Sequence, residues 1–476
     1  MIATIIIYLV IVLIVGIAAE RFSSKSEAGY YLGDRKFGPI ATAISAGATD
    51  SSGWQFIGAA GYAYAFGVSS LWMLPGLVLG YMVNWIIIAP RFQKFGKDNE
   101  CYSLADYFEK RFNDKTNLLK LTASIIIAIF FIAYMASQLS AAGKTINTVL
   151  NFDFHTSVII SVVFVLTYTI FAGYKAVIWT DVIQGLVMLG VFLLFPAIMI
   201  LKMGGFSDFF ATVGSIDPIL LSTAGGEVGA AAFGIIIGLF GIGLGEPGQP
   251  QLLQRYLSAK DTRTIRQGTY ISMLWVLIVV IGSNLIGLIG RVLLPGLEDP
   301  EYVFPTMAMT MLPAVFGGIV IAAIFAAIQS TYSSQLMVAT QAIASDIFKT
   351  VSKKKYTQKQ YVTIARITML VLSILATGIA LLNLETVFAL VLYAWAGLGA
   401  SFGPLLILSL YWKKTTKQGA FGGMIVGTVA TVIWKNTPYA AYLYEIIPAM
   451  ILSTIIIVII SNLTYKAPSI SEQKEY

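Results

Sequence analysis

Residues 44–61 read ISAGATDSSGWQFIGAAG, and residues 238–253 read GLFGIGLGEPGQPQLL. Both stretches lie in apolar surroundings, yet both are rich in glycine and carry an acid, Asp50 in the first and Glu246 in the second. Glycine inside a helix costs about 1 kcal/mol relative to alanine, and proline about 3 kcal/mol. We therefore predict that two helices are interrupted here.

The chain as a whole has the composition of an integral membrane protein. It is 57% hydrophobic and 12% charged, and apolar runs of this length are typical of transmembrane helices. We expect a single transmembrane domain over residues 1–465, followed by a short cytoplasmic tail at 466–476. About thirteen candidate spans lie near 2–19, 38–62, 67–90, 118–148, 156–172, 176–201, 229–256, 268–290, 308–345, 361–382, 386–410, 418–435 and 443–463.

The basic residues indicate the orientation. With thirteen spans, 27 of the 31 lysines and arginines fall on one side, which is the cytoplasmic side by the positive-inside rule. This predicts a multi-pass protein of the cell membrane with its N-terminus outside and its C-terminus in the cytoplasm. The net charge of +7 is then a sign of topology and not of nucleic-acid binding. A single cysteine, Cys101, excludes an internal disulfide, and a lone His155 excludes a histidine-rich metal site.

The two interrupted spans are the second and the seventh, so they cross in opposite directions. Interrupted helices in corresponding positions indicate the binding site of an inverted-repeat transporter. We predict an all-α fold in which residues 38–203 form one repeat of five spans and residues 229–411 the other. The first span and the last two would be peripheral. Alternatively, the glycines only allow neighbouring helices to pack closely.

A third stretch, AAIQSTYSSQ at residues 326–335, places hydroxyl groups inside a long apolar span. Ala327, Ser330, Thr331 and Ser334 share one helical face, and Ser333 lies beside Ser330. Two overlapping oxygen clusters result, each suited to a monovalent cation. The alternative is that the hydroxyls bond to carbonyls one turn earlier and only join helices.

An acid, Asp181, lies in the sixth predicted span, and an intramembrane carboxylate is a functional candidate by default. The sequence offers no obvious basic partner within the membrane, which predicts a bound metal ion beside Asp181. The alternative is a carboxylate that reaches cytoplasmic headgroups or water.

The chain resembles the sodium:solute symporters, and among them most closely the bacterial sodium/proline transporters. The resemblance covers nearly the whole chain and implies a prokaryotic protein with a leucine-transporter-like five-plus-five fold. The stretches that carry it are AISAGATDSSGW (43–54), YSLADYFEKRF (102–112), FFIAYMASQ (130–138), AVIWTDVIQGLVM (176–188), GLGEPGQPQLLQRYLSAKD (243–261) and AAIFAAIQSTYSSQLMVATQAIASDIFK (322–349).

The resemblance implies two sodium sites. The principal site would use backbone oxygens of Ala48, Ser51 and Ala327 and the hydroxyls of Ser330 and Thr331. A second site, like that of sialic acid transporters, would use four side chains: Asp181, Ser330, Ser333 and Ser334.

The resemblance also nominates substrate-binding residues, which are Gln55, Tyr134, Gln138, Ile242 and Glu246. Ile242 stands where proline transporters have tryptophan, and Glu246 stands where they have a neutral residue. Glu246 would meet a cationic group of the substrate or line the inner vestibule.

We therefore predict a sodium-coupled secondary active symporter that imports a small polar organic solute by alternating access. The solute would be an amino acid such as proline or a sugar acid such as sialic acid. Its partners would be one or two sodium ions, the solute and the lipid bilayer, with no organic cofactor and no enzymatic activity, and the protein would function as a monomer. The alternatives are a proton-coupled symporter, through Asp181 or Glu246, and a passive facilitator on the same scaffold.

Overall fold

The computed structural model describes residues 1–20, 27–169, 173–352 and 356–466, and these ranges are helical with short connections. The helices are α1 (Ile2–Glu20), α2 (Glu27–Leu32), α3 (Pro39–Gly53), α4 (Ala60–Phe66), α5 (Met73–Met82), α6 (Ala89–Asp98), α7 (Leu104–Arg111), α8 (Leu118–Leu150), α9 (Phe154–Thr169), α10 (Tyr174–Lys202), α11 (Phe206–Ile216), α12 (Gly229–Gly241), α13 (Pro250–Ser258), α14 (Thr262–Leu293), α15 (Val303–Thr310), α16 (Ala314–Thr340), α17 (Phe348–Ser352), α18 (Gln358–Leu382), α19 (Val387–Tyr411), α20 (Lys417–Lys435) and α21 (Ile446–Thr464).

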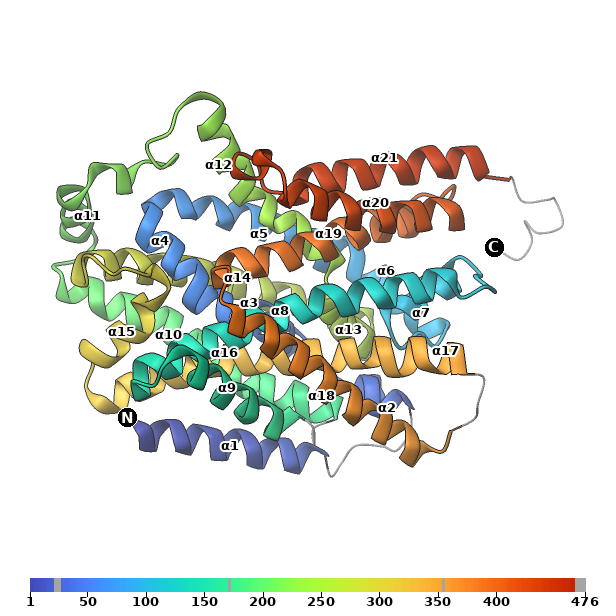
Figure 1. Cartoon of the computed structure of the whole chain (residues 1–476), viewed down its shortest axis with the longest axis horizontal. Helices are drawn as coiled ribbons and strands as arrows, with labels where there is room; N and C mark the ends of the chain where they lie inside the picture. Colours follow the sequence, from blue (N-terminus) through green and yellow to red (C-terminus); the bar gives the residue numbers. More distant parts are fainter. Residues whose placement is uncertain (21–26, 170–172, 353–355, 467–476) are drawn as a thin grey trace.

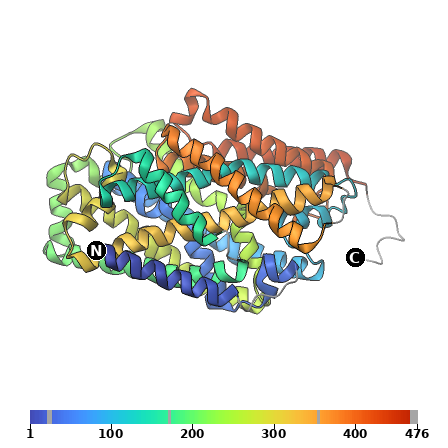
Figure 2. The ribbon, with the colours of Figure 1, turned by 60° about the horizontal axis from the view of Figure 1, so that its bottom comes forward.

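The long helices run along the longest axis of the molecule, with α1 beginning toward one end of that axis and α21 ending toward the other (Figure 1). In both views α1 lies at one edge of the bundle and α21 at the opposite edge (Figure 2). Within the described ranges, ten helical stretches are long and apolar enough to cross a membrane. The protein is therefore an all-helical, multi-pass membrane protein.

The span boundaries differ in part from the prediction. The spans predicted at 38–62 and 67–90 belong to one apolar stretch, Pro39–Asp98, that turns at Gly67, where φ is +67°. The span predicted at 308–345 is wrong at its start, because α15 ends at Thr310 and α16 begins only at Ala314. Pro313 separates them, since proline has no amide hydrogen to continue a helix. The count of thirteen spans stays a prediction.

The centre of the bundle is α3, which packs against α8, α10, α14 and α16. Small residues permit this close approach. A Cβ on Gly47 would lie 2.5 Å from the Trp275 ring, and one on Gly185 would lie 2.6 Å from Ile44 Cγ2. Trp275 is itself buried and donates from Nε1 to the Ser51 hydroxyl at 2.8 Å. Helix α3 is thus held in place by its neighbours on several sides.

Candidate functional site

The first predicted helix interruption is present, and it falls at Ser52. The backbone there has φ +49° and ψ 178°, after which the chain continues through Trp54–Ala59 into α4. Side chains satisfy the amides that the break leaves open: Gly53 N donates to Gln138 Oε1 at 2.8 Å, and Trp54 N donates to Ser52 Oγ at 3.0 Å. Irregular backbone at membrane depth is tolerated where protein covers it in this way.

The second predicted interruption is present as well, in a tight turn over Ile242–Gly248 that ends at the extended residue Gln249. Its carbonyls also bond to side chains of other helices. Trp395 Nε1 donates to Ile242 O at 2.8 Å, and Asn84 Nδ2 donates to Glu246 O at 2.9 Å. The turn lies against α5 and α19, so both broken helices face the interior of the bundle.

Hydroxyl groups of α16 contact backbone carbonyls of the broken helix α3. Ser330 Oγ donates to Ala48 O at 2.9 Å and to Ala327 O at 3.0 Å, and Thr331 Oγ1 donates to Thr49 O at 2.8 Å. The hydroxyls thus cross to α3 as well as bonding within their own helix. Two hydroxyls and three carbonyls gathered in this way have the chemistry of a sodium site.

Ser51, the remaining nominee for the principal site, lies on the same helix. Its backbone oxygen accepts from Trp54 N across the break. The carbonyl that Thr331 contacts belongs to Thr49, which the sequence had not nominated.

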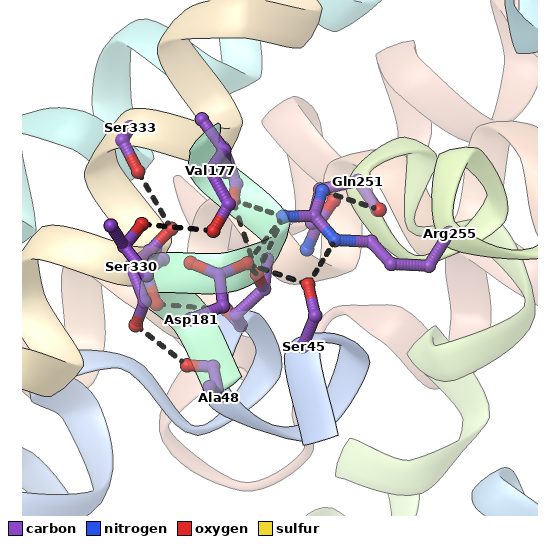
Figure 3. Close-up of polar contacts among 12 residues, drawn as sticks. Ser45, Ala48, Val177, Asp181, Gln251, Arg255, Ser330 and Ser333 are labelled. Atoms are coloured by element: carbon purple, nitrogen blue, oxygen red, sulfur yellow. Dashed lines mark hydrogen bonds and ion pairs between the residues drawn. The ribbon is translucent and has the colours of Figure 1, made fainter. Parts of the chain in front are cut away.

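In the second cluster, around Asp181, a side chain of the protein supplies the positive charge. The Arg255 guanidinium donates from Nη2 to Asp181 Oδ2 at 3.0 Å, to Thr49 Oγ1 at 2.9 Å and also to Ser334 Oγ. Ser45 Oγ donates to the same Asp181 oxygen at 2.6 Å. Figure 3 shows the guanidinium on one side of Asp181 and Ser330 and Ser333 of α16 on the other.

The prediction that Asp181 has no basic partner within the membrane is therefore wrong. Arg255 had been assigned to the cytoplasmic side, but α13 turns it inward, and the side chains of Arg255 and Asp181 are both fully buried. Ser333 takes no part in this contact, because its hydroxyl donates to Ser330 O at 3.2 Å. The second oxygen of Asp181, Oδ1, has no hydrogen-bond partner among the described residues.

Two further acids meet between the broken helices. Tyr81 donates to Asp50 Oδ2 at 2.5 Å, and Asn84 Nδ2 lies 3.5 Å from Glu246 Oε2. The two carboxyl groups, one from each broken helix, lie beside each other. Glu246 is almost fully buried.

A small cavity of about 20 Å³ opens beside Asp50. Gln55, Tyr134 and Ile242, three of the nominated substrate residues, line it together with Asp50. Gln138 instead caps the break at Gly53, and Glu246 lies behind Asp50. The sequence reasoning missed five lining residues, which are Trp54, Leu77, Val391, Leu392 and Trp395.

A larger vestibule of about 260 Å³ adjoins the cavity and shares Ile242 and Leu392 with it. Phe388 lines the vestibule and stacks on Trp54, with ring centroids 5.5 Å apart, and on Tyr62 at 4.7 Å. The stacked rings thus connect the lining of the vestibule, at Tyr62 and Phe388, with that of the cavity, at Trp54.

A helical membrane bundle with two broken helices around an interior cavity is the architecture of a secondary transporter. A model of the sodium:solute symporter family matches residues 30–427, and the chain belongs to this family. It is therefore a sodium:solute symporter, which is a transporter and not an enzyme.

Two bacterial relatives agree with this assignment. The chain is 37% identical to the high-affinity proline transporter PutP of Bacillus subtilis (strain 168), over 95% of each chain. It is 36% identical to the sodium/proline symporter of Staphylococcus aureus (strain JH9), over 97% of this chain and 92% of the relative.

Two solved structures share the fold. One is a Na⁺-coupled sialic acid symporter in a substrate-bound outward-open state, with a TM-score of 0.80 at 23% identity, over 98% of each chain. The other is the nucleobase-cation-symport-1 family transporter MHP1 in a closed conformation, with a TM-score of 0.55 at 14% identity, over 94% of this chain and 97% of that one. Both resemble the leucine-transporter-like fold expected from the sequence, while the boundaries of the two repeats stay a prediction.

Proposed function

We propose that the protein imports a small organic solute together with sodium by alternating access, and that the principal sodium site is formed by Ala48, Ser51, Ala327, Ser330 and Thr331. The supporting observation is the convergence of α16 hydroxyls on α3 carbonyls next to the break at Ser52. An ion held there ties α16 to the broken helix, whose next turn carries the cavity residues Trp54 and Gln55. Ion binding and the shape of the solute site are coupled in this way.

We also propose that the N-terminus faces outward in a bacterial plasma membrane and that the functional unit is a monomer. The orientation is supported by the basic residues, of which 27 of 31 fall on the C-terminal side of the predicted topology. Inward movement of each sodium ion then gains about 2.3 kcal/mol per 100 mV of membrane potential.

The second sodium site, at Asp181, Ser330, Ser333 and Ser334, is proposed as a site that alternates with Arg255. The guanidinium already neutralises Asp181 and contacts Ser334, so a sodium ion gains access only when Arg255 withdraws. One sodium then binds in the conformation described, and a second binds in another conformation of the cycle.

The variant Arg255→Gln tests whether sodium competes with the guanidinium for the second site. If sodium competes with the guanidinium, sodium stabilises this variant against heat with a steeper dependence on its concentration than it does wild type. Adding Ser334→Ala should remove the difference. Equal dependence in wild type and Arg255→Gln would rule out the second site.

The solute is proposed to be an amino acid, with proline as the first candidate from the printed functions of the relatives. A sugar acid such as sialic acid is the second candidate, but the acidic cavity wall at Asp50 opposes an anion. The relatives' substrate does not transfer directly, because Ile242 and Glu246 depart from the residues that proline transporters carry at these positions.

Reconstituted vesicles test the proposed function. L-proline and N-acetylneuraminic acid serve as radiolabelled probes, with an inward sodium gradient and the pH held equal on both sides. We expect accumulation of one probe above equilibrium. A proton-coupled symporter would accumulate the probe only with a pH gradient, and a passive facilitator would not exceed equilibrium under either condition.

A further inference from the structure

The cavity has one charged residue in its wall and otherwise aromatic, aliphatic and amide surface. Asp50 supplies the charge, and its Oδ1 has no hydrogen-bond partner among the described residues. The rest of the lining includes the rings of Trp54, Tyr134 and Trp395. A buried carboxylate oxygen without a donor is costly, so an occupant that supplies a donor is strongly favoured.

Glu246 adds a second acid directly behind the first. It is 1% exposed, and its Oε1 also lacks a partner among the described residues. Helix α5 leaves room for it, because a Cβ on Gly80 would lie 2.6 Å from Glu246 Cγ. The two buried basic residues of the described part of the chain bond elsewhere, Arg255 to Asp181 and Lys144 to Asp299 and Glu301.

The surroundings select the kind of cation that fits the acid pair. A bare sodium ion needs a cage of oxygens, which the clusters on α16 offer and this cavity does not. Aromatic faces beside a carboxylate suit an organic ammonium group, because rings attract cations that keep apolar substituents.

A third polar group indicates what else the solute carries. The Trp54 indole Nε1 is buried, lines the cavity and lacks a partner among the described residues. As a donor only, it requires an acceptor such as a carboxylate or carbonyl oxygen.

We propose that Asp50, with Glu246 as the positioning residue behind it, binds a cationic amine of the transported solute, while Trp54 Nε1 donates to an acceptor on the same molecule. This assignment rests on the proposed function, since it takes the cavity, which must widen during the transport cycle to admit a solute, to be the solute site. It makes the acid pair the determinant of substrate class: amines are accepted, and anions without an amine are rejected.

The test is thermal stabilisation of the purified protein by matched pairs of solutes in sodium chloride. The probes are L-proline, L-alanine, L-glutamine and putrescine, each beside its fully N-acetylated form. We expect at least one free amine to raise the apparent melting temperature and its acetylated form to leave it unchanged. Equal shifts from both members of a pair, or no shift from any amine, would overturn the proposal.

Variants test the assignment to residues. Asp50→Asn should abolish the shift by the amine, and Glu246→Gln, which keeps the side-chain size, should weaken amine affinity about tenfold or more. Both should retain the shift caused by sodium chloride alone, relative to potassium chloride, because neither side chain is among the proposed sodium ligands, which are Ala48, Ser51, Ala327, Ser330 and Thr331. Unchanged amine affinity in both variants would contradict the proposal.

The change in melting temperature caused by sodium also distinguishes a failure of the amine assignment from a failure of the proposed sodium site. If sodium alone stabilises wild type but no amine does, the amine assignment fails and the proposed function stands. If an amine stabilises wild type and sodium has no effect, the proposed sodium site fails and the amine assignment stands.

Discussion

Arg255 and Asp181 form an ion pair at 3.0 Å in which neither side chain is exposed. The two residues are brought together by α13, the continuation of one broken helix, and α10. A buried charge that loses its partner costs about 3–5 kcal/mol, whereas replacing both charges is often much less costly.

The first prediction concerns this pair. Asp181→Asn and Arg255→Gln should each lower the free energy of unfolding by about 3–5 kcal/mol, and the double variant should be more stable than either single variant. Thermal unfolding in detergent ranks the single variants and the double variant by stability. Lys435→Gln is the control, because its pair with Glu385 is longer, at 3.7 Å, and partly exposed, so the change should stay below about 1 kcal/mol. A double variant less stable than both singles would contradict the argument.

The second prediction concerns the principal sodium site. Thr331→Ala removes an oxygen that contacts the α3 carbonyl of Thr49. The sodium concentration for half-maximal stabilisation should rise about tenfold, equivalent to about 1.4 kcal/mol. Thr331→Ser keeps the hydroxyl and should remain within a few-fold of wild type. An unchanged sodium requirement in Thr331→Ala would exclude this hydroxyl as a ligand.

The sequence predicted those features that depend on local chemistry. Glycine and proline located both helix breaks, and helical spacing placed Ser330 and Thr331 on one buried face. The family resemblance nominated Gln55, Tyr134 and Ile242, and all three line the cavity. These features need no knowledge of how distant helices approach one another.

The partner of Asp181 could not be found in the same way, because it lies 74 residues further along the chain. The prediction of orientation assigned Arg255 to the cytoplasmic side of the membrane. The assignment gave no sign that its side chain points into the bundle. One signal was available: Asp181 and Arg255 lie near the ends of spans that both point to the predicted cytoplasmic side. An acid and a base at equal depth are candidates for a pair.

The third prediction concerns the geometry of the first break. A Cβ on Gly53 would lie 2.8 Å from Ile328 Cγ1 and 3.0 Å from Ala141 Cβ. Gly53→Ala should therefore lower the free energy of unfolding by about 1–3 kcal/mol through overpacking. Gly190→Ala in α10 is the matched control, since nothing lies within 4 Å of the added atom, and it should be neutral or stabilising by up to about 1 kcal/mol. Equal effects of the two substitutions would contradict the predicted overpacking at Gly53.

The fourth prediction concerns Asp114, in the connection between α7 and α8. It accepts from Leu119 N at 2.8 Å at the start of α8 and pairs with Lys417 Nζ at 2.5 Å. Burial alone would raise its pKa, but the hydrogen bonds from Lys417, Thr116 and Leu119 outweigh this and lower the pKa to about 2. Because the folded pKa lies below the ordinary value of 3.8, Asp114 stabilises the fold above about pH 4, and this contribution is lost as the pH falls toward 2.

Asp114→Asn should therefore lower the apparent melting temperature at pH 6, and the difference from wild type should shrink as the pH falls from 4 to 3. Lys417→Met removes one of the groups that lower the pKa, so stability in this variant should begin to fall at a higher pH than in wild type. Melting curves between pH 6 and pH 3 measure both effects. A difference between wild type and Asp114→Asn that stays constant over this range would show that Asp114 acts through packing and not through its charge.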